Sequence, residues 1–186
     1  MLTKIITRFC YLIIIIILAV CLNNFIYRDY TINSDLSNLE TSIGDFYMRG
    51  GDSRPVLAVY GSVTLGNNTY KVAEINGSVA LITLQKNLWG QYAINSMHQG
   101  SANYGRKLKE TAGKKYLLFW GRNEDSEIAL VSFELDSVKY EMTIPAEKLF
   151  IVAAEIDSKN KDIEINVSDL TMYDKQGADI AEEIIR

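Results

Sequence analysis

The amino-acid sequence predicts a mostly β protein, an antiparallel β-sandwich that is Ig-like or jelly-roll-like, preceded by an N-terminal transmembrane helix and a short juxtamembrane helix. One long apolar run stands near the start of the 186-residue chain. Short β-rich segments then follow at roughly ten-residue spacing, joined by hairpin signals, which favours a sandwich over a closed barrel. The predicted divisions are a cytoplasmic N-terminus at 1–8, a transmembrane signal anchor at 9–27, a stem with a short amphipathic helix at 28–54, and an extracytoplasmic β-sandwich domain at 55–186.

The segment from Phe9 to Tyr27 has the length and the composition of a membrane span. Its 19 residues would rise about 28 Å as a helix, close to the thickness of the bilayer hydrocarbon. Lys4 and Arg8 precede it, whereas the opposite flank begins with an Arg-Asp pair. The positive-inside rule then places the N-terminus in the cytoplasm and the rest of the chain outside. The favoured interpretation is an uncleaved, single-pass signal anchor in the cell membrane.

Two other fates of this segment stay open. Leu18-Ala19-Val20-Cys21 resembles a lipobox with Cys21 as the lipidated residue, although Val20 stands where Gly, Ala or Ser is usual. A cleaved secretory signal is the third interpretation, and its small-x-small cleavage pattern is poor. Both cysteines, Cys10 and Cys21, lie in this segment. The predicted β domain therefore has neither a disulfide framework nor thiol chemistry.

Charge is distributed unevenly along the chain, whose net charge is -4. Residues up to Asn123 carry 13 Lys+Arg against 7 Asp+Glu, and residues from Glu124 carry 6 against 16. An acidic C-terminal portion argues against general nucleic-acid binding, which needs a basic face. Acidic residues in alternation are typical of the solvated face of strands. We expect no nucleic-acid partner.

A short helix is predicted in the stem. Its apolar residues recur at spacings of three and four, which is the pattern of one buried stripe: Leu36, Leu39, Ile43, Phe46 and Tyr47. Either Ser34 caps this helix, or Ser37 and Glu40 form a capping box. The pair Gly50-Gly51 ends it. The stripe is expected to pack on the domain.

Strands are predicted at Val56–Leu65, Tyr70–Ile75, Ser78–Leu84, Tyr116–Trp120, Glu127–Leu135, Val138–Ile144, Leu149–Ile156 and Ile163–Tyr173. Asn76-Gly77 predicts a type I′ hairpin, because both residues tolerate positive φ. Asp136-Ser137 predicts a second hairpin, and Gly61 a β-bulge. Residues Gln85 to Lys115 are less regular, and a short helix from about Gly105 to Thr111 is one option there. A long irregular stretch in a compact domain is often functional.

The sequence contains few residues in patterns that would indicate a catalytic site or a metal site. His98 is the only histidine, and no Gly-x-Ser-x-Gly motif accompanies it. A zinc site with nitrogen and sulfur ligands is excluded for the β domain. Asp157, Asn160 and Asp162 form one acidic loop, and Asp174 and Asp179 bracket a glycine, but neither group has EF-hand spacing. A weak calcium site and catalysis by carboxylates alone stay open. We assign no catalytic, cofactor-binding or metal-ligating residue and expect no cofactor and no enzymatic activity.

The irregular stretch also holds the candidate surface for a ligand or partner. Its aromatic residues suit the stacking of a sugar ring, and its basic residues suit anionic lipid headgroups or a wall polymer. Alternatively, the aromatic residues belong to the core and the basic residues to an ordinary solvated face. The candidate residues are Trp89, Tyr92, Tyr104, Arg106, Lys107 and Lys109.

Three segments carry a resemblance to a known group of proteins: Tyr116-Leu-Leu-Phe-Trp-Gly-Arg-Asn123, Ile144-Pro145, and Leu170-Thr-Met-Tyr-Asp-Lys-Gln-Gly-Ala-Asp-Ile180. Together they resemble small membrane-anchored or lipoprotein-like extracytoplasmic proteins of low-GC Gram-positive bacteria. The resemblance covers the last 70 residues or so. It implies a location at the cell envelope, and it assigns neither an activity nor a functional residue.

These observations favour a non-enzymatic, membrane-tethered extracytoplasmic module that binds an unknown envelope protein or polymer. A cell-wall or carbohydrate-binding module that uses the region from Trp89 to Tyr104 is the first alternative. A structural subunit of an envelope complex is the second, and a large exposed apolar patch would be expected for it.

Overall fold

The computed structural model describes residues 11, 13–18, 30–51, 53–100, 103–157, 165 and 169–184. Residues 13–18 are helical and exposed. Among the described residues, no helix is both long enough and apolar enough to cross a membrane. Most of the predicted span from Phe9 to Tyr27, with Cys10 and Cys21, lies outside the described residues.

The described chain is mostly β, and its strands pair antiparallel, as predicted. The first sheet has the order β1-β2-β3-β4, the second β5-β6-β9, and the third β10-β7-β8. The elements are α2 (Leu39–Met48), β1 (Leu57–Leu65), β2 (Asn68–Ile75), β3 (Ser78–Lys86), β4 (Tyr92–Gln99), β5 (Tyr104–Thr111), β6 (Lys114–Arg122), β7 (Leu130–Leu135), β8 (Val138–Thr143), β9 (Leu149–Ile156), β10 (Thr171–Tyr173) and α3 (Ala181–Ile184).

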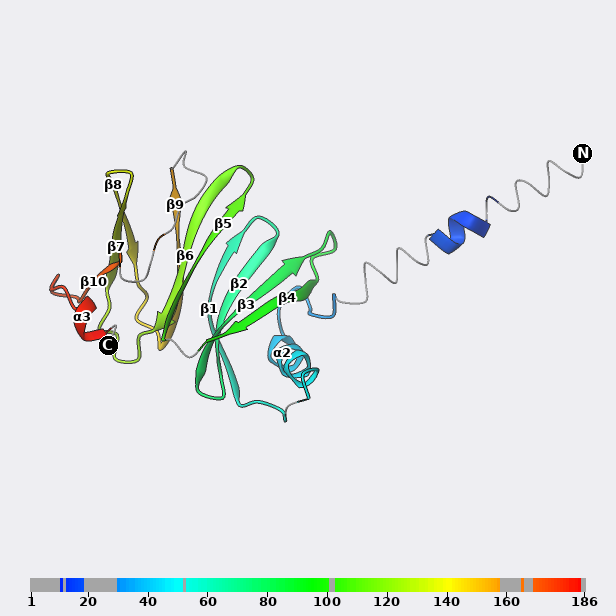
Figure 1. Cartoon of the computed structure of the whole chain (residues 1–186). Helices are drawn as coiled ribbons and strands as arrows, with labels where there is room; N and C mark the ends of the chain where they lie inside the picture. Colours follow the sequence, from blue (N-terminus) through cyan, green and yellow to red (C-terminus); the bar gives the residue numbers. More distant parts are fainter. Residues whose placement is uncertain are drawn as a thin grey trace, which may run out of the picture.

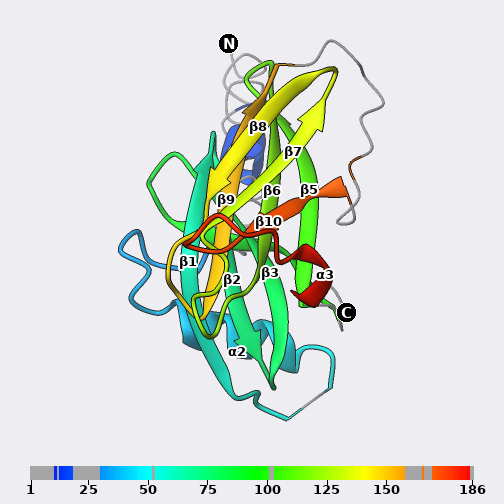
Figure 2. The same cartoon turned by 90° about the vertical axis from the view of Figure 1, so that its left-hand side faces the viewer.

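The sheets stack face to face, in agreement with a sandwich, but with three sheets and a helical layer. Figure 1 shows the order of the layers: α2, the first sheet, the second sheet and the third sheet. Figure 2 views the stack from the third sheet, with β7 and β8 in front. The two inner sheets are therefore covered on both faces. This explains why β3 is buried continuously from Val79 to Leu84 instead of alternating.

An apolar cluster fills each interface between layers. Under α2, Ile43 packs with Ile75 and Ile82 of the first sheet. Between the first and second sheets, Leu81 packs with Leu118. Between the second and third sheets, Leu117 packs in a cluster that includes Phe119, Phe133, Phe150 and Met172. The neighbours Leu117 and Leu118 thus enter opposite clusters, because successive side chains of a strand point to opposite faces.

Local turn chemistry sets the connections. Asn76 and Gly77 have φ of 50° and 81° and join Ile75 to Ser78, so the predicted type I′ hairpin is confirmed. Asp136 and Ser137, with φ of 51° and 60°, likewise confirm the hairpin between β7 and β8. The register shift between Val59 and Ser62 confirms the bulge at Gly61. Because short turns join consecutive strands, β1 to β4 form a meander. The Greek-key connections expected of an Ig-like or jelly-roll-like sandwich are not found in this sheet.

Four expectations need correction. The helix considered at Gly105 to Thr111 is wrong: this segment is β5, which pairs with β6 along its whole length. The stretch from Gln85 to Lys115 is accordingly more regular than predicted, because β4 and β5 fill much of it. The N-cap of α2 is Asn38, whose side chain makes no capping hydrogen bond. The predictions that Ser34 caps this helix, or that Ser37 begins a capping box, are therefore wrong. Asn38 Oδ1 instead accepts a 2.8 Å hydrogen bond from the Asn33 amide. Of the last predicted strand, only Thr171–Tyr173 is a described strand.

Candidate functional site

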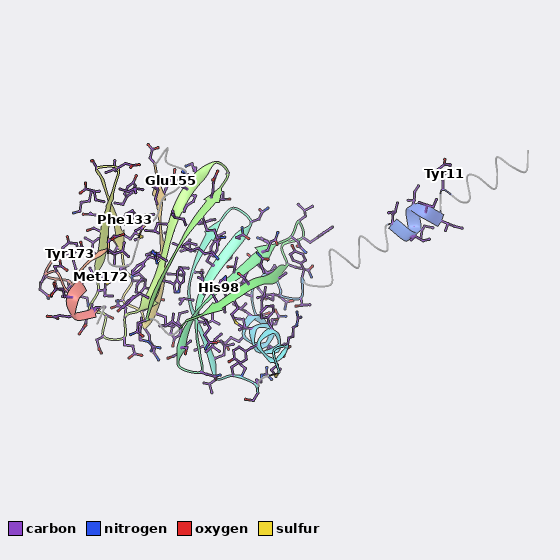
Figure 3. The ribbon with its side chains drawn as sticks, in the orientation of Figure 1. Tyr11, His98, Phe133, Glu155, Met172 and Tyr173 are labelled. Atoms are coloured by element: carbon purple, nitrogen blue, oxygen red, sulfur yellow. The ribbon has the colours of Figure 1, made fainter. Side chains whose placement is uncertain are left out.

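Strand β5 divides its polar side chains between its two faces. Tyr104 and Leu108 pack toward the third sheet, where Tyr104 stacks on Phe119 with ring centroids 6.1 Å apart. Arg106, on the same face, donates from Nε to the carbonyl of Ile165. Lys107 points the other way, and its Nζ lies 3.5 Å from Nε2 of His98 on β4. Figure 3 shows His98 on the first sheet.

Lys109 shares the face of Lys107, because side chains two residues apart in a strand point the same way and lie roughly 7 Å apart. The pKa of Lys107 is lowered, first by burial and then by the positive charge of Lys109. In the part of the chain that the structure describes, neither lysine forms an ion pair with a carboxylate. Lys114, at the end of the same hairpin, is paired with Glu155 at 2.8 Å. We call Lys107, Lys109 and the neighbouring His98 the basic edge, in which the two lysine charges have no described counter-charge.

The aromatic candidates do not gather on one face. Tyr92 is 9% exposed and belongs to the cluster under α2, with Lys86 Nζ 5.5 Å from the centroid of its ring. Trp89 is 59% exposed in the turn between β3 and β4. Tyr104 lies in the cluster between the second and third sheets. Burial and then the carboxylate of Glu127 raise the pKa of Tyr104 to about 12. The structure therefore separates the residues that a sugar-stacking platform would need.

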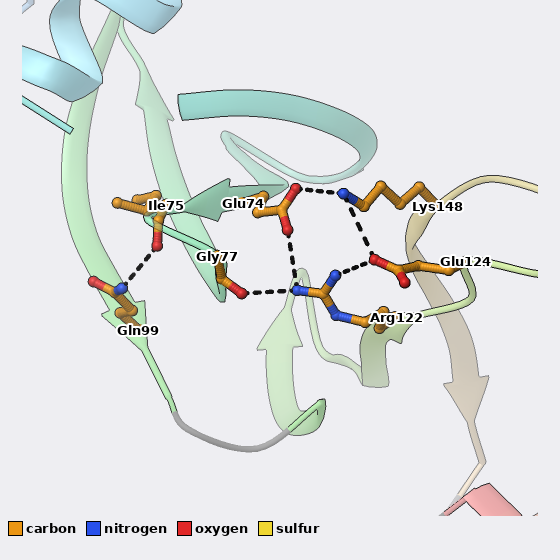
Figure 4. A network of polar contacts seen from close by, with 7 residues as sticks. All are labelled: Glu74, Ile75, Gly77, Gln99, Arg122, Glu124 and Lys148. Atoms are coloured by element: carbon orange, nitrogen blue, oxygen red, sulfur yellow. Dashed lines mark hydrogen bonds and ion pairs between the residues drawn. The ribbon is translucent and has the colours of Figure 1, made fainter. Parts of the chain in front are cut away.

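A group of four charged residues ties the first sheet to the second (Figure 4). Glu74 of β2 contacts Arg122 at 3.2 Å and Lys148 at 2.8 Å. Arg122 also pairs with Glu124 and donates a 2.9 Å hydrogen bond to the carbonyl of Gly77. Hydrogen bonding from Lys148, followed by that from Arg122, lowers the pKa of Glu74. With two positive and two negative charges, this network has no net charge, and it links the first sheet to the second.

A small hollow lies between α2 and β4. Its volume is about 210 Å³, and the Arg49 guanidinium at its wall lies 5.5 Å from the centroid of the Phe46 ring. Sequence reasoning missed it, since it depends on the placement of α2 against the sheet. The lining residues are Thr31, Ile32, Ser42, Phe46, Arg49 and Ile94.

Asp174 and Asp179 serve local turns. Asp174 Oδ1 accepts hydrogen bonds of 2.8 Å from the amides of Gln176 and Ala178. Asp179 Oδ1 accepts one of 3.0 Å from the Ala181 amide. Within the described residues, no three His, Cys, Asp or Glu side chains are grouped to hold a metal ion. Asn160 and Asp162 of the other acidic loop lie outside those residues.

The fold and the basic edge define a mostly antiparallel β protein with three stacked sheets and a positive strand at the border of the second. Compared with protein-family models, with curated proteins and with solved structures, the chain has no match.

Proposed function

We propose that this chain is a membrane-tethered, extracytoplasmic and non-enzymatic binding module of the bacterial cell envelope, and that its basic edge binds an anionic envelope polymer. One observation carries the proposal: Lys107 and Lys109 lie on the same face of an edge strand, beside His98 and without an ion-pair partner among the described residues. An anionic ligand would supply the missing counter-charge.

The tether is supported by the sequence. The apolar segment from Phe9 to Tyr27 is long enough to span a bilayer as a transmembrane helix, and Lys4 and Arg8 precede it. This arrangement favours a single-pass protein in the cell membrane, with a cytoplasmic N-terminus and the β domain outside. The absence of enzymatic activity is proposed because the sequence after Cys21 contains one histidine and no cysteine.

A polymer with repeated negative charges fits the arrangement of the two lysines. They follow one another at roughly 7 Å along the strand and lie on the same face. A chain with repeated charges can place one anionic group against each lysine. Residues up to Asn123, which include β5, carry 13 Lys+Arg against 7 Asp+Glu, and this local excess of positive charge would direct an anionic chain to β5.

Binding of polyglycerol phosphate to the full-length chain in nanodiscs of neutral lipid tests the proposal. The double variant Lys107→Gln/Lys109→Gln is expected to bind about 2- to 30-fold more weakly, since each exposed charge pair contributes roughly 0.2–1 kcal/mol. Lys139→Gln is the control, because Lys139 is an exposed β8 lysine that pairs with Glu141 at 2.7 Å. Equal loss of affinity in the control and the double variant would contradict a specific role for the basic edge, as would unchanged affinity in the double variant.

A further inference from the structure

The turn between β3 and β4 has a fixed conformation. Asn87 Oδ1 accepts hydrogen bonds from the amides of Trp89 at 3.0 Å and Gln91 at 2.9 Å. The Asn87 amide donates to the carbonyl of Gln91 at 2.9 Å, and that of Gly90 donates to the carbonyl of Asn87 at 3.2 Å. Gly90 has a φ of 85°, which L side chains rarely adopt. The tip residues Leu88 and Trp89 are thus presented by a closed loop.

This tip exposes two large apolar side chains in succession. Leu88 is 96% exposed and Trp89 is 59% exposed. Lys86, at the start of the turn, adds a positive charge. A tryptophan, an aliphatic side chain and a lysine together are typical of the boundary between lipid hydrocarbon and headgroups, where an amphipathic indole ring and a cation both fit.

The turn also lies where the described domain begins. Ile32 and Tyr92 exchange backbone hydrogen bonds of 3.0 and 2.9 Å, which join the entering chain to the base of the turn. Ser34 Cβ lies 3.6 Å from the position that a Cβ on Gly90 would take. Figure 1 shows this turn beside the entry of the chain, with the third sheet at the far side of the domain. Ile32 follows Tyr27, the last residue of the apolar segment, by five positions, and five residues span at most roughly 17 Å.

We propose that Leu88 and Trp89 insert into the interfacial layer of the bilayer that holds the N-terminal segment, with Lys86 facing the lipid headgroups. This inference rests on the tether of the proposed function. It gives the domain a fixed orientation: α2 and the first sheet lie on the membrane side, and the third sheet points away from it. The short connection from Tyr27 keeps the tip within reach of the interface.

Quenching of tryptophan fluorescence by brominated lipid tests the insertion. The chain has two tryptophans, Trp89 and Trp120, and Trp120 is half-buried and packs in the cluster between the first and second sheets. The full-length protein is reconstituted in phosphatidylcholine vesicles with bromine at shallow acyl positions and, in parallel, without bromine. The wild-type chain is expected to lose the Trp89 part of its emission in the brominated vesicles. Trp89→Phe, an exposed substitution that leaves Trp120 as the only reporter, is expected to lose almost none.

Flotation of the same vesicles separates the two ways in which the inference can fail. If the protein floats with the vesicles and bromine quenches wild type and Trp89→Phe to the same small extent, the tip does not insert, and the inference alone is overturned. If the protein does not float with the vesicles, both the tether and the insertion are overturned. Flotation together with quenching that Trp89→Phe abolishes supports the inference.

Discussion

Glu74 of β2 and Arg122 at the end of β6 form a 3.2 Å ion pair that joins the first sheet to the second. Both side chains are largely buried, with 19% and 20% of their surface exposed. Lys148 contacts the other carboxylate oxygen of Glu74 at 2.8 Å. One carboxylate therefore holds Arg122 of β6 and Lys148, which immediately precedes β9, and its removal leaves both cations with Glu124 alone.

Glu74→Gln is expected to lower the free energy of unfolding by about 1–2 kcal/mol, since hydrogen bonds to charged groups contribute roughly that much and their cationic partners stay behind. Urea denaturation of the full-length chain in detergent measures it. Glu141→Gln is the matched control, because the Glu141 pair with Lys139 is exposed on both sides and should change stability little. An equal loss of unfolding free energy in the two variants would show that the inter-sheet ion pair stabilises the protein no more than an exposed one.

The contribution of Glu74 should also depend on pH. The cations lower the pKa of this carboxyl below its ordinary value of 4.5, so its stabilisation is fully present above about pH 4.5 and is lost as pH falls through the lower folded-state pKa. The difference in unfolding free energy between wild type and Glu74→Gln should therefore be constant above that pH and shrink below it. A difference that grows on acidification would contradict the assignment.

Gly105→Ala is expected to destabilise the second sheet by about 1–3 kcal/mol. Gly105 lies opposite Trp120 across the β5–β6 pair, and a Cβ there would overlap the indole ring. Gly61→Ala is the control, since its Cβ would meet its nearest neighbour at an ordinary 3.6 Å and its φ is not positive. Thermal unfolding by circular dichroism compares the two variants. Full stability of Gly105→Ala would show that Trp120 does not need the space above the glycine.

Asn87→Ala should loosen the β3–β4 turn without unfolding the domain. The substitution removes the acceptor for the amides of Trp89 and Gln91, so both are expected to exchange hydrogen faster, while amides inside β3 keep their protection. Hydrogen-exchange mass spectrometry of the full-length chain follows both sets. Unchanged exchange in the turn would mean that other contacts fix its conformation.

The sequence best predicts those features, such as hairpin turns, that a short segment determines by itself. Asn76-Gly77 and Asp136-Ser137 specify their hairpins because the turn geometry depends on those residues themselves. The third sheet was not predicted, because a buried run such as that of β3 does not reveal what covers its second face. Leu117 and Leu118 are alike in sequence, yet they enter different interfaces.

The candidate site was predicted in part. Charge alone singles out Lys107 and Lys109 in the sequence, and the structure places Lys107 beside His98, to which the sequence assigns no role. Gly105 made β5 look irregular, whereas its lack of a side chain makes room for Trp120. Had residues 104–111 been recognised as a strand, their period of two would have separated Arg106 from Lys107. The placement of Tyr92 under α2 depends on contacts between distant segments.

The salt dependence of polyanion binding tests the central claim most directly. The full-length chain in neutral nanodiscs is titrated with polyglycerol phosphate at several salt concentrations, for wild type and for Lys107→Gln/Lys109→Gln. If the two lysines contact anionic groups, affinity falls with rising salt, and the slope of log affinity against log salt is smaller in the double variant by up to about two. Identical slopes in the two proteins would contradict the assignment of the basic edge as the binding surface.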